Sequence, residues 1–526
     1  MANKIQFKRG AKSKLPTLAV GEPGLCTDTN EVFVGGSSGN IGLATTEQLA
    51  DLAYNVKKYG TVVSAVQAAA TSGGVVFVPP GSFSVGSNLT IPGNVTLLFA
   101  IGSMINVVTG ATLTIDGYID AGPYQVFTGA GSVVYNAKNT EAYPEWWGAK
   151  GDGTTNDSAA IQKALAAARV LRCRPTSYYI GSKINIPQNK FIAIKGGGYR
   201  QTTFLIAPNI VGFDFLRDKS VGGVVLTFDG IEFVESGLGK TSYAVSFVGV
   251  PLYHDNSLRF DNCSFYGFSR GAYLKYCGGI NFNKCYAQVN AVVYFLERDA
   301  SNVTWDGCFN LNNGNFIYAD DPLADGLSNG LIVNNCSAIY SDGADIRIIG
   351  WQAIYIRGGA GYDFGGPGGS ASIYLGKCMD FTIDSVYVCP DNYGTTKNAT
   401  NRYCIKLEDC HSGLIQGNSI YNAGGVSIAI IKSVVKNSSL TIRDNVFDGS
   451  SGIDIFLSAG IGVVIEGNKF LKQMSRTGTD YEIYANTPGT NYNIIKNNIF
   501  VGSSFTITAG ANSIVGDNLF GVPYIV

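Results

Sequence analysis

The stretch PEWWGAKGDGTTNDSAAIQKAL, residues 144–165, joins two adjacent tryptophans to a glycine-framed acidic turn and a short amphipathic segment. In the turn Gly151-Asp152-Gly153, the two glycines relieve the backbone of clashes with a Cβ atom. Asp157 is placed to cap a following helix by accepting a hydrogen bond from its free N–H groups. One helical face then carries Ile161, Ala164, Leu165 and Ala168. The stretch predicts the entrance of a larger domain and supplies no catalytic group by itself.

Length and composition limit what this chain can be. Its 526 residues suffice for several domains, and its 67 glycines favour short strands and tight turns over long helices. Charged residues make up 15% and the net charge is -1, so a basic nucleic-acid-binding surface is not expected. The N-terminal MANKIQFKRG is polar and basic, and the most apolar stretch, residues 95–108, is too short to span a bilayer. We therefore expect a soluble protein with no nucleic-acid partner and no membrane insertion.

The eleven cysteines lack the paired CxxC spacing of a metal site, and we expect neither a metal nor a cofactor. Because cysteine packs as a small hydrophobe, the cysteines that recur in similar polar settings predict a stacked interior ladder of free thiols. These are Cys263, Cys285, Cys308 and Cys336. Stacked strands lie ~4.8 Å apart, so distance alone leaves disulfides between neighbours open. Synthesis in a reducing cytosol argues against them.

The chain divides into four parts. Residues 1–45 are short apolar pieces separated by turn residues, which predicts a small β module. Residues 46–60 contain TEQLADLAYNVKK, a helical pattern too short to be stable alone. This helix packs either against copies of itself, as a neck, or on its own chain. Residues 61–143 alternate strand and turn patterns and predict a β-rich lead-in domain. Residues 144–526 form the last and largest part.

From about residue 175 onward, apolar runs are followed by Asn, Asp or Gly and then by an apolar or aromatic residue. The asparagines Asn445, Asn468, Asn498 and Asn518 are 23, 30 and 20 residues apart. Repeats of ~20–30 residues with β character indicate a solenoid, here of roughly fifteen turns. We expect the asparagines to adopt the left-handed conformation at tight corners and to bond to the next turn. The helix after Asp157 is expected to cap the open end of the stack.

Three segments support a family resemblance. GAKGDGTTNDSAAIQKAL is similar to the entry motif of the pectate-lyase-like parallel β-helix family of phage tailspikes and capsule depolymerases. The preceding ATLTIDGYIDAGPYQVFTGAGSVVYNAKNTEAYPEWW resembles the lead-in to that motif in phage proteins. IQFKRGAKSKLPTLAVGEPGLCTDTNEVFVG resembles the N-terminal domain of phage tropism determinants and related tail-fibre proteins. Elsewhere the likeness is one of repeat style only.

The resemblance implies an all-β fold, namely a right-handed single-stranded parallel β-helix of the pectate-lyase type with a small N-terminal β module and short helices. It also implies a homotrimer located in the virion, in the phage tail, and made in the host cytoplasm. The N-terminal module would contact phage tail or baseplate proteins, and the implied ligand is a bacterial surface polysaccharide. Because this fold hosts hydrolases, lyases and pure binders, the resemblance leaves the chemistry open.

Candidate chemistry gathers in the polar segments 317–330 and 339–359. Glycoside hydrolysis needs two carboxyl groups, ~5–5.5 Å apart for retention or ~6.5–9.5 Å for inversion, and turns stacked ~4.8 Å apart supply either separation. The candidate catalytic residues are Asp320, Asp321, Asp342 and Asp345, with Glu297 of LERDASNVTWDG as a further candidate. Aromatic rings stack on sugars and arginine binds acidic groups bidentately. The expected substrate-binding residues are therefore Tyr318, Tyr340, Arg347, Trp351 and Arg357.

Other interpretations of these residues stay open. Single aspartates in such a segment also solvate turns, and Glu297 can form a surface ion pair of little energetic value. The two histidines stand in separate segments, YHDNS and LEDCHSG, so no Ser–His–Asp or metal constellation is supported. The clustered calcium-binding carboxylates of a true pectate lyase are not evident. The sequence therefore predicts a polysaccharide-hydrolysing tailspike, with a binding-only tail protein, a polysaccharide lyase and a structural baseplate or neck protein as alternatives.

Overall fold

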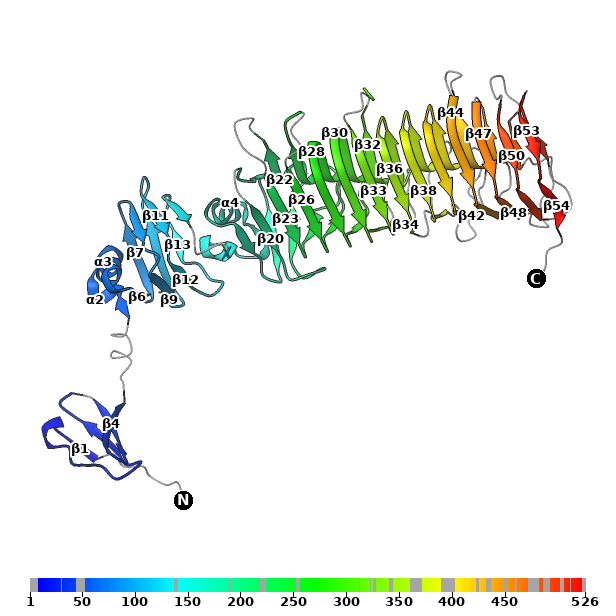
Figure 1. Ribbon diagram of the computed structural model, residues 1–526. Coiled ribbons are helices and arrows are strands. Elements are labelled where there is room, and N and C mark those ends of the chain that lie inside the picture. Colours follow the sequence, from blue (N-terminus) through cyan, green and yellow to red (C-terminus); the bar gives the residue numbers. More distant parts are fainter. Residues whose placement is uncertain are drawn as a thin grey trace. The chain divides into compact units, whose positions relative to one another are not determined.

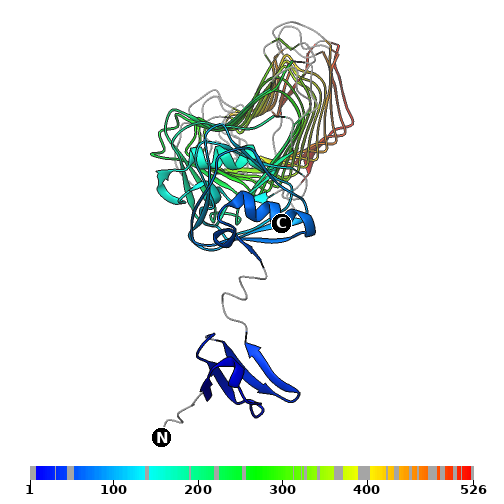
Figure 2. The same ribbon diagram turned by 90° about the vertical axis from the view of Figure 1, so that its left-hand side faces the viewer.

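The computed structural model is a mostly β chain that divides into two compact units. One unit comprises residues 1–140 and 145–148, and the other comprises residues 141–144 and 149–526. Figure 1 shows the second unit as a long stack of strands, and Figure 2 shows that stack turned by 90°. The structure describes residues 8–29, 31–43, 53–136, 141–188, 191–217, 224–251, 256–311, 313–321, 323–324, 328–339, 344–359, 371–388, 403–421, 425–431, 437–448, 453–458, 461–471, 482–485, 492–501, 506–510 and 512–522.

The N-terminal module is a four-stranded sheet whose strands follow chain order. The first pair is parallel and the others are antiparallel. The strands are β1 (Lys8–Gly10), β2 (Pro23–Cys26), β3 (Val32–Gly36) and β4 (Gly39–Leu43), with the short helix η1 (Lys12–Lys14) after β1. Leu18 and Cys26 are the buried apolar residues of its small core. The small N-terminal β unit predicted from the sequence is confirmed.

The helix predicted within residues 46–58 is present over only part of the described residues of that segment. Residues 44–52 lie outside the described residues, and Tyr54–Asn55 form strand β5 rather than helix. Only α2 (Val56–Tyr59) is helical, because the Asn55 side chain caps it by accepting a hydrogen bond from the Lys57 N–H at 3.0 Å. The helical prediction is therefore wrong at Tyr54 and Asn55.

A longer helix, α3 (Val62–Ser72), lies where strands and turns were expected. Thr61 caps it by accepting a hydrogen bond from the Ser64 N–H at 3.0 Å. Val62, Val66, Ala65 and Ala69 are buried, so the apolar face of α3 packs against β6, β7 and β8. The expectation of continuous strand-and-turn structure missed this helix, because its valines also fit a strand pattern.

The remainder of the lead-in domain is itself a short parallel stack. Its strands form three sheets in which each strand pairs in parallel with the corresponding strand one turn later. The strands are β6 (Gly74–Val78), β7 (Gly81–Val85), β8 (Leu89–Ile91), β9 (Val95–Phe99), β10 (Ser103–Val107), β11 (Thr112–Ile115), β12 (Tyr118–Asp120), β13 (Phe127–Thr128) and β14 (Ser132–Tyr135). The short helix η2 (Pro144–Trp147) brings Trp147 onto Phe127, with ring centres 5.2 Å apart.

The second unit is a single-chain parallel β-helix of about 14 turns, with three strand positions per turn that we call faces A, B and C. Face A contains β19 (Ile184–Asn185), β22 (Val211–Leu216), β25 (Tyr243–Val248), β32 (Asn315–Asp320), β35 (Ile346–Ile349), β37 (Ala371–Gly376), β40 (Tyr403–Glu408), β43 (Val426–Ile431), β46 (Ile453–Leu457), β49 (Ile483–Tyr484) and β52 (Ile507–Thr508). Two long strands, β28 (Arg270–Asn283) and β30 (Val292–Asp306), run through both face A and face B.

Face B contains β15 (Glu141–Ala142), β17 (Val170–Arg172), β20 (Ile192–Lys195), β23 (Val225–Asp229), β26 (Ser257–Asp261), β33 (Asn329–Asn334), β36 (Gln352–Arg357), β38 (Met379–Asp384), β41 (His411–Gln416), β44 (Asn437–Arg443), β47 (Ile461–Glu466), β50 (Ile494–Lys496) and β53 (Ile514–Gly516). Face C contains β16 (Asp152–Asn156), β18 (Ser177–Ile180), β21 (Thr203–Ile206), β24 (Glu232–Glu235), β27 (Ser264–Tyr266), β29 (Tyr286–Gln288), β31 (Phe309–Leu311), β34 (Ser337–Ile339), β39 (Tyr387–Val388), β42 (Ser419–Tyr421), β45 (Val446–Asp448), β48 (Lys469–Leu471), β51 (Ile499–Val501) and β54 (Leu519–Val522).

The core of the β-helix is built from like residues stacked on successive turns. Phe228, Phe260 and Phe282 stack with ring centres 5.2 and 4.8 Å apart and nearly parallel planes. Phe447 and Phe470, from the predicted repeats, stack at 4.8 Å. Because inward side chains recur at the same place in each turn, the stack buries a continuous apolar column. The predicted inward stacking is confirmed.

The corner between faces B and C explains the recurring cysteines and asparagines. Cys263, Cys285, Cys308 and Cys336 occupy it on successive turns as buried free thiols, which confirms the predicted ladder. Further along, Asn418, Asn445, Asn468, Asn498 and Asn518 occupy the same position. The left-handed residue is the one before each ladder residue, for example Asp444 with φ 57° and Asn497 with φ 56°. The prediction that the ladder asparagines themselves are left-handed is therefore wrong.

The entry motif closes the first turns of the stack. Helix α4 (Ser158–Ala167) packs on β17 and β19 and buries Ile161 and Leu165, in agreement with the predicted cap. Asp157 stands at the N-cap position of α4, as predicted, but its side chain makes no capping hydrogen bond to the helix. The Asp157 carboxylate instead accepts hydrogen bonds from the N–H groups of Lys150 and Gly151, at 2.7 and 3.0 Å.

Candidate functional site

Face A carries one outward column of large side chains through the middle of the β-helix. The members are register partners on successive turns and are all partly exposed, while the residue after each one is buried. We call Tyr273, Phe295, Tyr318, Arg347, Tyr374 and Lys406 the aromatic column. The column arises because side chains alternate between core and exterior along each strand, and parallel pairing repeats that alternation at every turn.

Cationic side chains lie over the rings of the aromatic column. The Arg270 guanidinium lies 3.8 Å from the centre of the Phe295 ring. The Arg347 guanidinium lies 4.4 Å from the Tyr374 ring centre and 5.5 Å from that of Tyr318. Phe295 and Tyr318 stack on each other with ring centres 5.1 Å apart. These contacts hold flat rings and positive charge in a fixed order along the stack.

Two residues further along each strand is a second column, which includes three carboxylates. Its members on successive turns are Lys275, Glu297, Asp320, Ile349, Gly376 and Glu408. Glu297 accepts hydrogen bonds from the Tyr273 hydroxyl and the Lys275 ammonium. Partial burial raises the pKa of Glu297, but these hydrogen bonds outweigh it and leave the pKa below its usual value. Glu297 is therefore held as a carboxylate.

Asp320 lies one turn further along and has the opposite environment. Among the described residues, no hydrogen bond or ion pair to its carboxylate is present. Burial raises the pKa of Asp320 above its usual value, although the nearby Arg347 lowers it, and the charges of Asp321 and Glu297 raise it further. Glu297 and Asp320 are direct register partners, so their backbones are ~4.8 Å apart. The surroundings therefore shift the pKa values of the two carboxyl groups in opposite directions.

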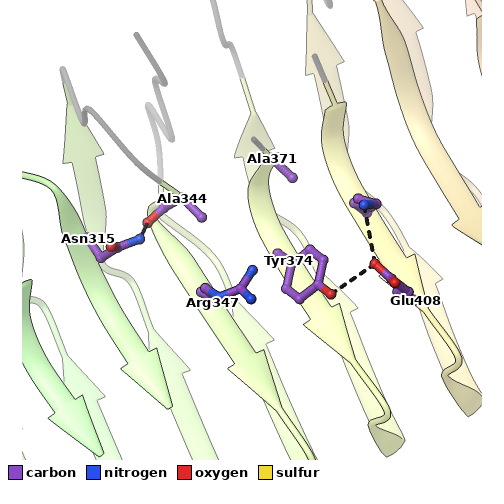
Figure 3. Close-up of a pocket in the computed structure, with 7 residues that line it drawn as sticks. Asn315, Ala344, Arg347, Ala371, Tyr374 and Glu408 are labelled. Carbon is purple, nitrogen blue, oxygen red and sulfur yellow. Dashed lines mark hydrogen bonds and ion pairs between the residues drawn. The ribbon is translucent and has the colours of Figure 1, made fainter. Parts of the chain in front are cut away.

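A pocket of about 280 Å³ opens on face A, and Figure 3 shows residues that line it. Its lining is formed by Asn315, Ala344, Arg347, Ala371, Tyr374, Lys406 and Glu408. The Tyr374 hydroxyl donates a hydrogen bond to Glu408 at 2.9 Å, and Lys406 pairs with the same carboxylate at 3.2 Å. Burial and this hydrogen bond raise the pKa of Tyr374 to about 12, so Tyr374 stays protonated.

Four predicted site residues come together on face A, namely Glu297, Tyr318, Asp320 and Arg347. The others do not. Asp321 and Asp345 are buried, and Trp351 is 1% exposed in the core. The corner at Gly350 (φ 75°) is followed by a side chain that turns inward, so the Trp351 ring is not accessible to a sugar. Arg357 lies on face B, 5.1 Å from the ring centre of Tyr355. Tyr340 and Asp342 lie outside the described residues.

The sequence did not connect Tyr374, Lys406 and Glu408 with this site. Arg347 and its register partner Tyr374 are 27 residues apart, and Tyr374 and its partner Lys406 are 32 apart. Because the turns differ in length, no constant spacing in the sequence aligns these residues. A signal is nevertheless present, because the strand sequences IRII, IYLG and IKLE place their outward residue at the same position. Among the described residues, no group of His, Cys, Asp and Glu is arranged to hold a metal ion. No helix described here has the length and apolarity needed to cross a membrane.

Two parts of the chain match family models. Residues 5–37 match the model described as "Major tropism determinant N-terminal domain". Residues 372–523 match the model described as "Right handed beta helix region". The chain is therefore a right-handed β-helix protein with an N-terminal domain of the tropism-determinant type, which confirms the resemblance and the fold class predicted from its sequence. No curated protein matches the sequence significantly.

Among solved structures, the chain is similar to tailspike protein 3 of bacteriophage CBA120, with 15% identity, a TM-score of 0.48, and coverage of 73% of this chain and 62% of that one. A protein of Geobacillus virus E2 matches with 16% identity, a TM-score of 0.38, and coverage of 64% and 63%. A GH87 alpha-1,3-glucanase from Streptomyces thermodiastaticus matches with 12% identity, a TM-score of 0.40, and coverage of 73% and 70%. The chain spans less than two thirds of the length of either viral protein.

Proposed function

We propose that this protein is a phage tailspike that binds a bacterial surface polysaccharide along face A and cleaves it by carboxylate-assisted hydrolysis. The observation that carries the proposal is the Glu297–Asp320 pair, two carboxyl groups on adjacent turns whose surroundings shift their pKa values in opposite directions. Hydrolysis needs one carboxyl group that acts as the acid and a second that acts as the base or nucleophile, and surroundings that push their pKa values apart assign these roles. The aromatic column beside the pair supplies flat surfaces on which successive sugar rings can stack.

The spacing of the pair favours a retaining mechanism. Side chains that start ~4.8 Å apart fit the ~5–5.5 Å separation of retaining glycosidases better than the wider gap of inverting ones. Asp320, as the acid, protonates the glycosidic oxygen while Glu297 attacks the anomeric carbon and forms a glycosyl ester. The leaving chain departs with the proton. Water then attacks the anomeric carbon and breaks its bond to Glu297, which leaves as a carboxylate, while Asp320, now ionised, accepts the proton of the water and is restored.

The N-terminal module and the likeness to tropism determinants support attachment to the virion. The match over residues 5–37 is to a domain named for tropism, that is, for the choice of host. We place this module at the phage tail, bound to tail or baseplate proteins, with the β-helix directed toward the bacterial surface. The assembly proposed is a homotrimer, with its polypeptides made in the host cytoplasm.

The test is the release of reducing ends from the surface polysaccharide of a strain whose cells the protein binds. The wild type is expected to release them, and Asp320→Asn and Glu297→Gln to lose about 10²–10⁴-fold in rate while still binding the polymer. Asp306→Asn is the matched control, because Asp306 lies on the same strand, β30, but on face B, and it should cleave normally. Full activity of Asp320→Asn would overturn the assignment.

Other outcomes identify the alternative functions. Binding of the polymer without new reducing ends identifies a binding-only tail protein. Ultraviolet-absorbing unsaturated ends identify a lyase. A protein that binds no bacterial cells is a structural component of the tail.

A further inference from the structure

The pocket on face A has an unbalanced charge. Of its lining residues, Arg347 and Lys406 are cationic and Glu408 is anionic. Lys406 and Glu408 form an ion pair at 3.2 Å and neutralise each other. Among the described residues, no carboxylate lies within ion-pair distance of Arg347, so Arg347 gives the pocket a net positive charge.

The position of Arg347 is nevertheless fixed. Its guanidinium lies between two rings of the aromatic column, 5.5 Å from the centre of Tyr318 and 4.4 Å from that of Tyr374. Tyr374 is fixed in turn by its hydrogen bond to Glu408, and Figure 3 shows Arg347 and Tyr374 side by side on neighbouring strands. A stacked guanidinium keeps its N–H donors in one plane, and that planar fork matches the oxygens of a carboxylate or phosphate.

Gly376 helps to set this geometry. A Cβ atom at this position would meet the Tyr374 ring at 3.1 Å, which is tighter than ordinary contact. The absence of a side chain lets the Tyr374 ring lie along the strand and reach Glu408 on the next turn. The Tyr374 ring therefore covers Gly376 and forms part of the pocket wall next to Arg347.

We propose that this pocket is an anion subsite, in which Arg347 binds a negatively charged substituent of the polysaccharide. The inference rests on the proposed function and narrows its substrate to an acidic polymer. A sugar carboxylate and a phosphate ester offer the same oxygens to the guanidinium, and the test distinguishes them. Arg347 is the register partner of Tyr318, two residues before Asp320 on β32, so an anion held by Arg347 would position the polysaccharide chain near the Glu297–Asp320 pair.

The experiment uses the full-length protein and the surface polysaccharide purified from a strain that it binds. Three polymers are compared: the native one, one whose carboxyl groups have been reduced to alcohols, and one whose phosphate esters have been removed with hydrofluoric acid. Binding is measured by biolayer interferometry and cleavage by reducing ends. The treatment that removes the recognised anion should weaken binding by the wild type on the order of 10- to 100-fold, the range of a charge-assisted hydrogen-bonded contact.

Arg347→Met should bind the native polymer as weakly as the wild type binds the treated one, and should no longer distinguish the two. Arg357→Met is the matched control, because that arginine also lies over a tyrosine ring but on face B, and it should behave as the wild type. Circular dichroism and thermal unfolding verify that both variants are folded. A neutral polymer that is bound and cleaved, or an Arg347→Met protein that still discriminates, overturns the subsite and leaves the proposed function standing. A wild type that neither binds nor cleaves any polymer overturns both.

Discussion

At the scale of single residues, the effect of the Arg347 charge on the pKa of Asp320 predicts the direction in which the pH profile of activity shifts when Arg347 is replaced. Asp320, as the acid, must be protonated, so kcat/KM should fall as pH rises through its pKa. Arg347 lowers that pKa by its positive charge. Removing the charge in Arg347→Met therefore raises the pKa of Asp320 and moves the alkaline limb of the profile to higher pH. The measurement is kcat/KM against pH on a polysaccharide that the protein cleaves.

The limb position is independent of how strongly the variant binds, so the shift separates the electrostatic effect of Arg347 from its role in recognition. Arg357→Met, on face B, should leave the limb in place. A limb that moves to lower pH, or stays unmoved in Arg347→Met, contradicts the role of Asp320 as the acid.

The sequence predicts whether a site residue points outward only where the residue lies in a regular strand, because side chains there alternate between core and exterior. Tyr318 and Asp320 were predicted as members of a polar segment, and they share an outward face because they stand two apart on strand β32. Trp351 was wrongly predicted to bind substrate, because the direction of its side chain depends on the corner at Gly350, which no local sequence pattern predicts. Glu408 stood in a segment that was considered separately, because its proximity to Arg347 depends on a register that turns of unequal length conceal.

At the scale of the element, the asparagine ladder predicts local stability. The Asn468 side chain accepts a hydrogen bond from the Asn445 backbone N–H at 3.0 Å and donates one to the Asn498 side chain at 3.0 Å. Asn468→Ala leaves the buried Asn445 N–H without its acceptor, whereas the Asn498 side chain keeps the hydrogen bond from the Asn468 backbone N–H at 3.0 Å. We expect a loss of about 1–3 kcal/mol, seen as faster hydrogen exchange in β45, β48 and β51.

Lys469→Ala is the control for this variant, because Lys469 is the next residue in the chain but is exposed. Its exchange rates should equal those of the wild type. Unchanged exchange in Asn468→Ala would mean that the stacked rings of Phe447, Phe470 and Phe500 hold these turns without the ladder.

The elements show why the fold was more predictable than its details. The recurring Asn-x-Phe units predicted a solenoid, because each repeat must place the same residue at the same corner to stack. The left-handed backbone conformation lies at the residue before each ladder asparagine and not at the asparagine itself. Composition could not predict this, since Asn497 and Asn498 are both asparagine. Helix α3 was missed because valine and alanine in VVSAVQAAATS are compatible with both strand and helix.

At the scale of the whole molecule, the surface of the N-terminal module predicts association with other copies of the chain. Its buried apolar core is small, whereas Val20, Ile41 and Leu43 are 77%, 59% and 49% exposed. Exposed apolar residues gathered on so small a module favour association with other chains. For the homotrimer proposed above, light scattering should give a mass three times the 55.7 kDa of one chain.

The same surface predicts which substitution lowers that mass. Ile41→Asp places a charge among the exposed apolar residues of the module, where burial against a second copy would cost several kcal/mol. It should reduce the trimer fraction at low protein concentration and leave the cleavage rate per chain unchanged, because the Glu297–Asp320 pair lies within one chain. Ile101→Asp, at an isoleucine of the lead-in domain that is 80% exposed, is the matched control and should remain trimeric. A wild-type mass of one chain would exclude the trimer. A loss of cleavage in dissociated Ile41→Asp would instead show that a neighbouring subunit contributes to the site.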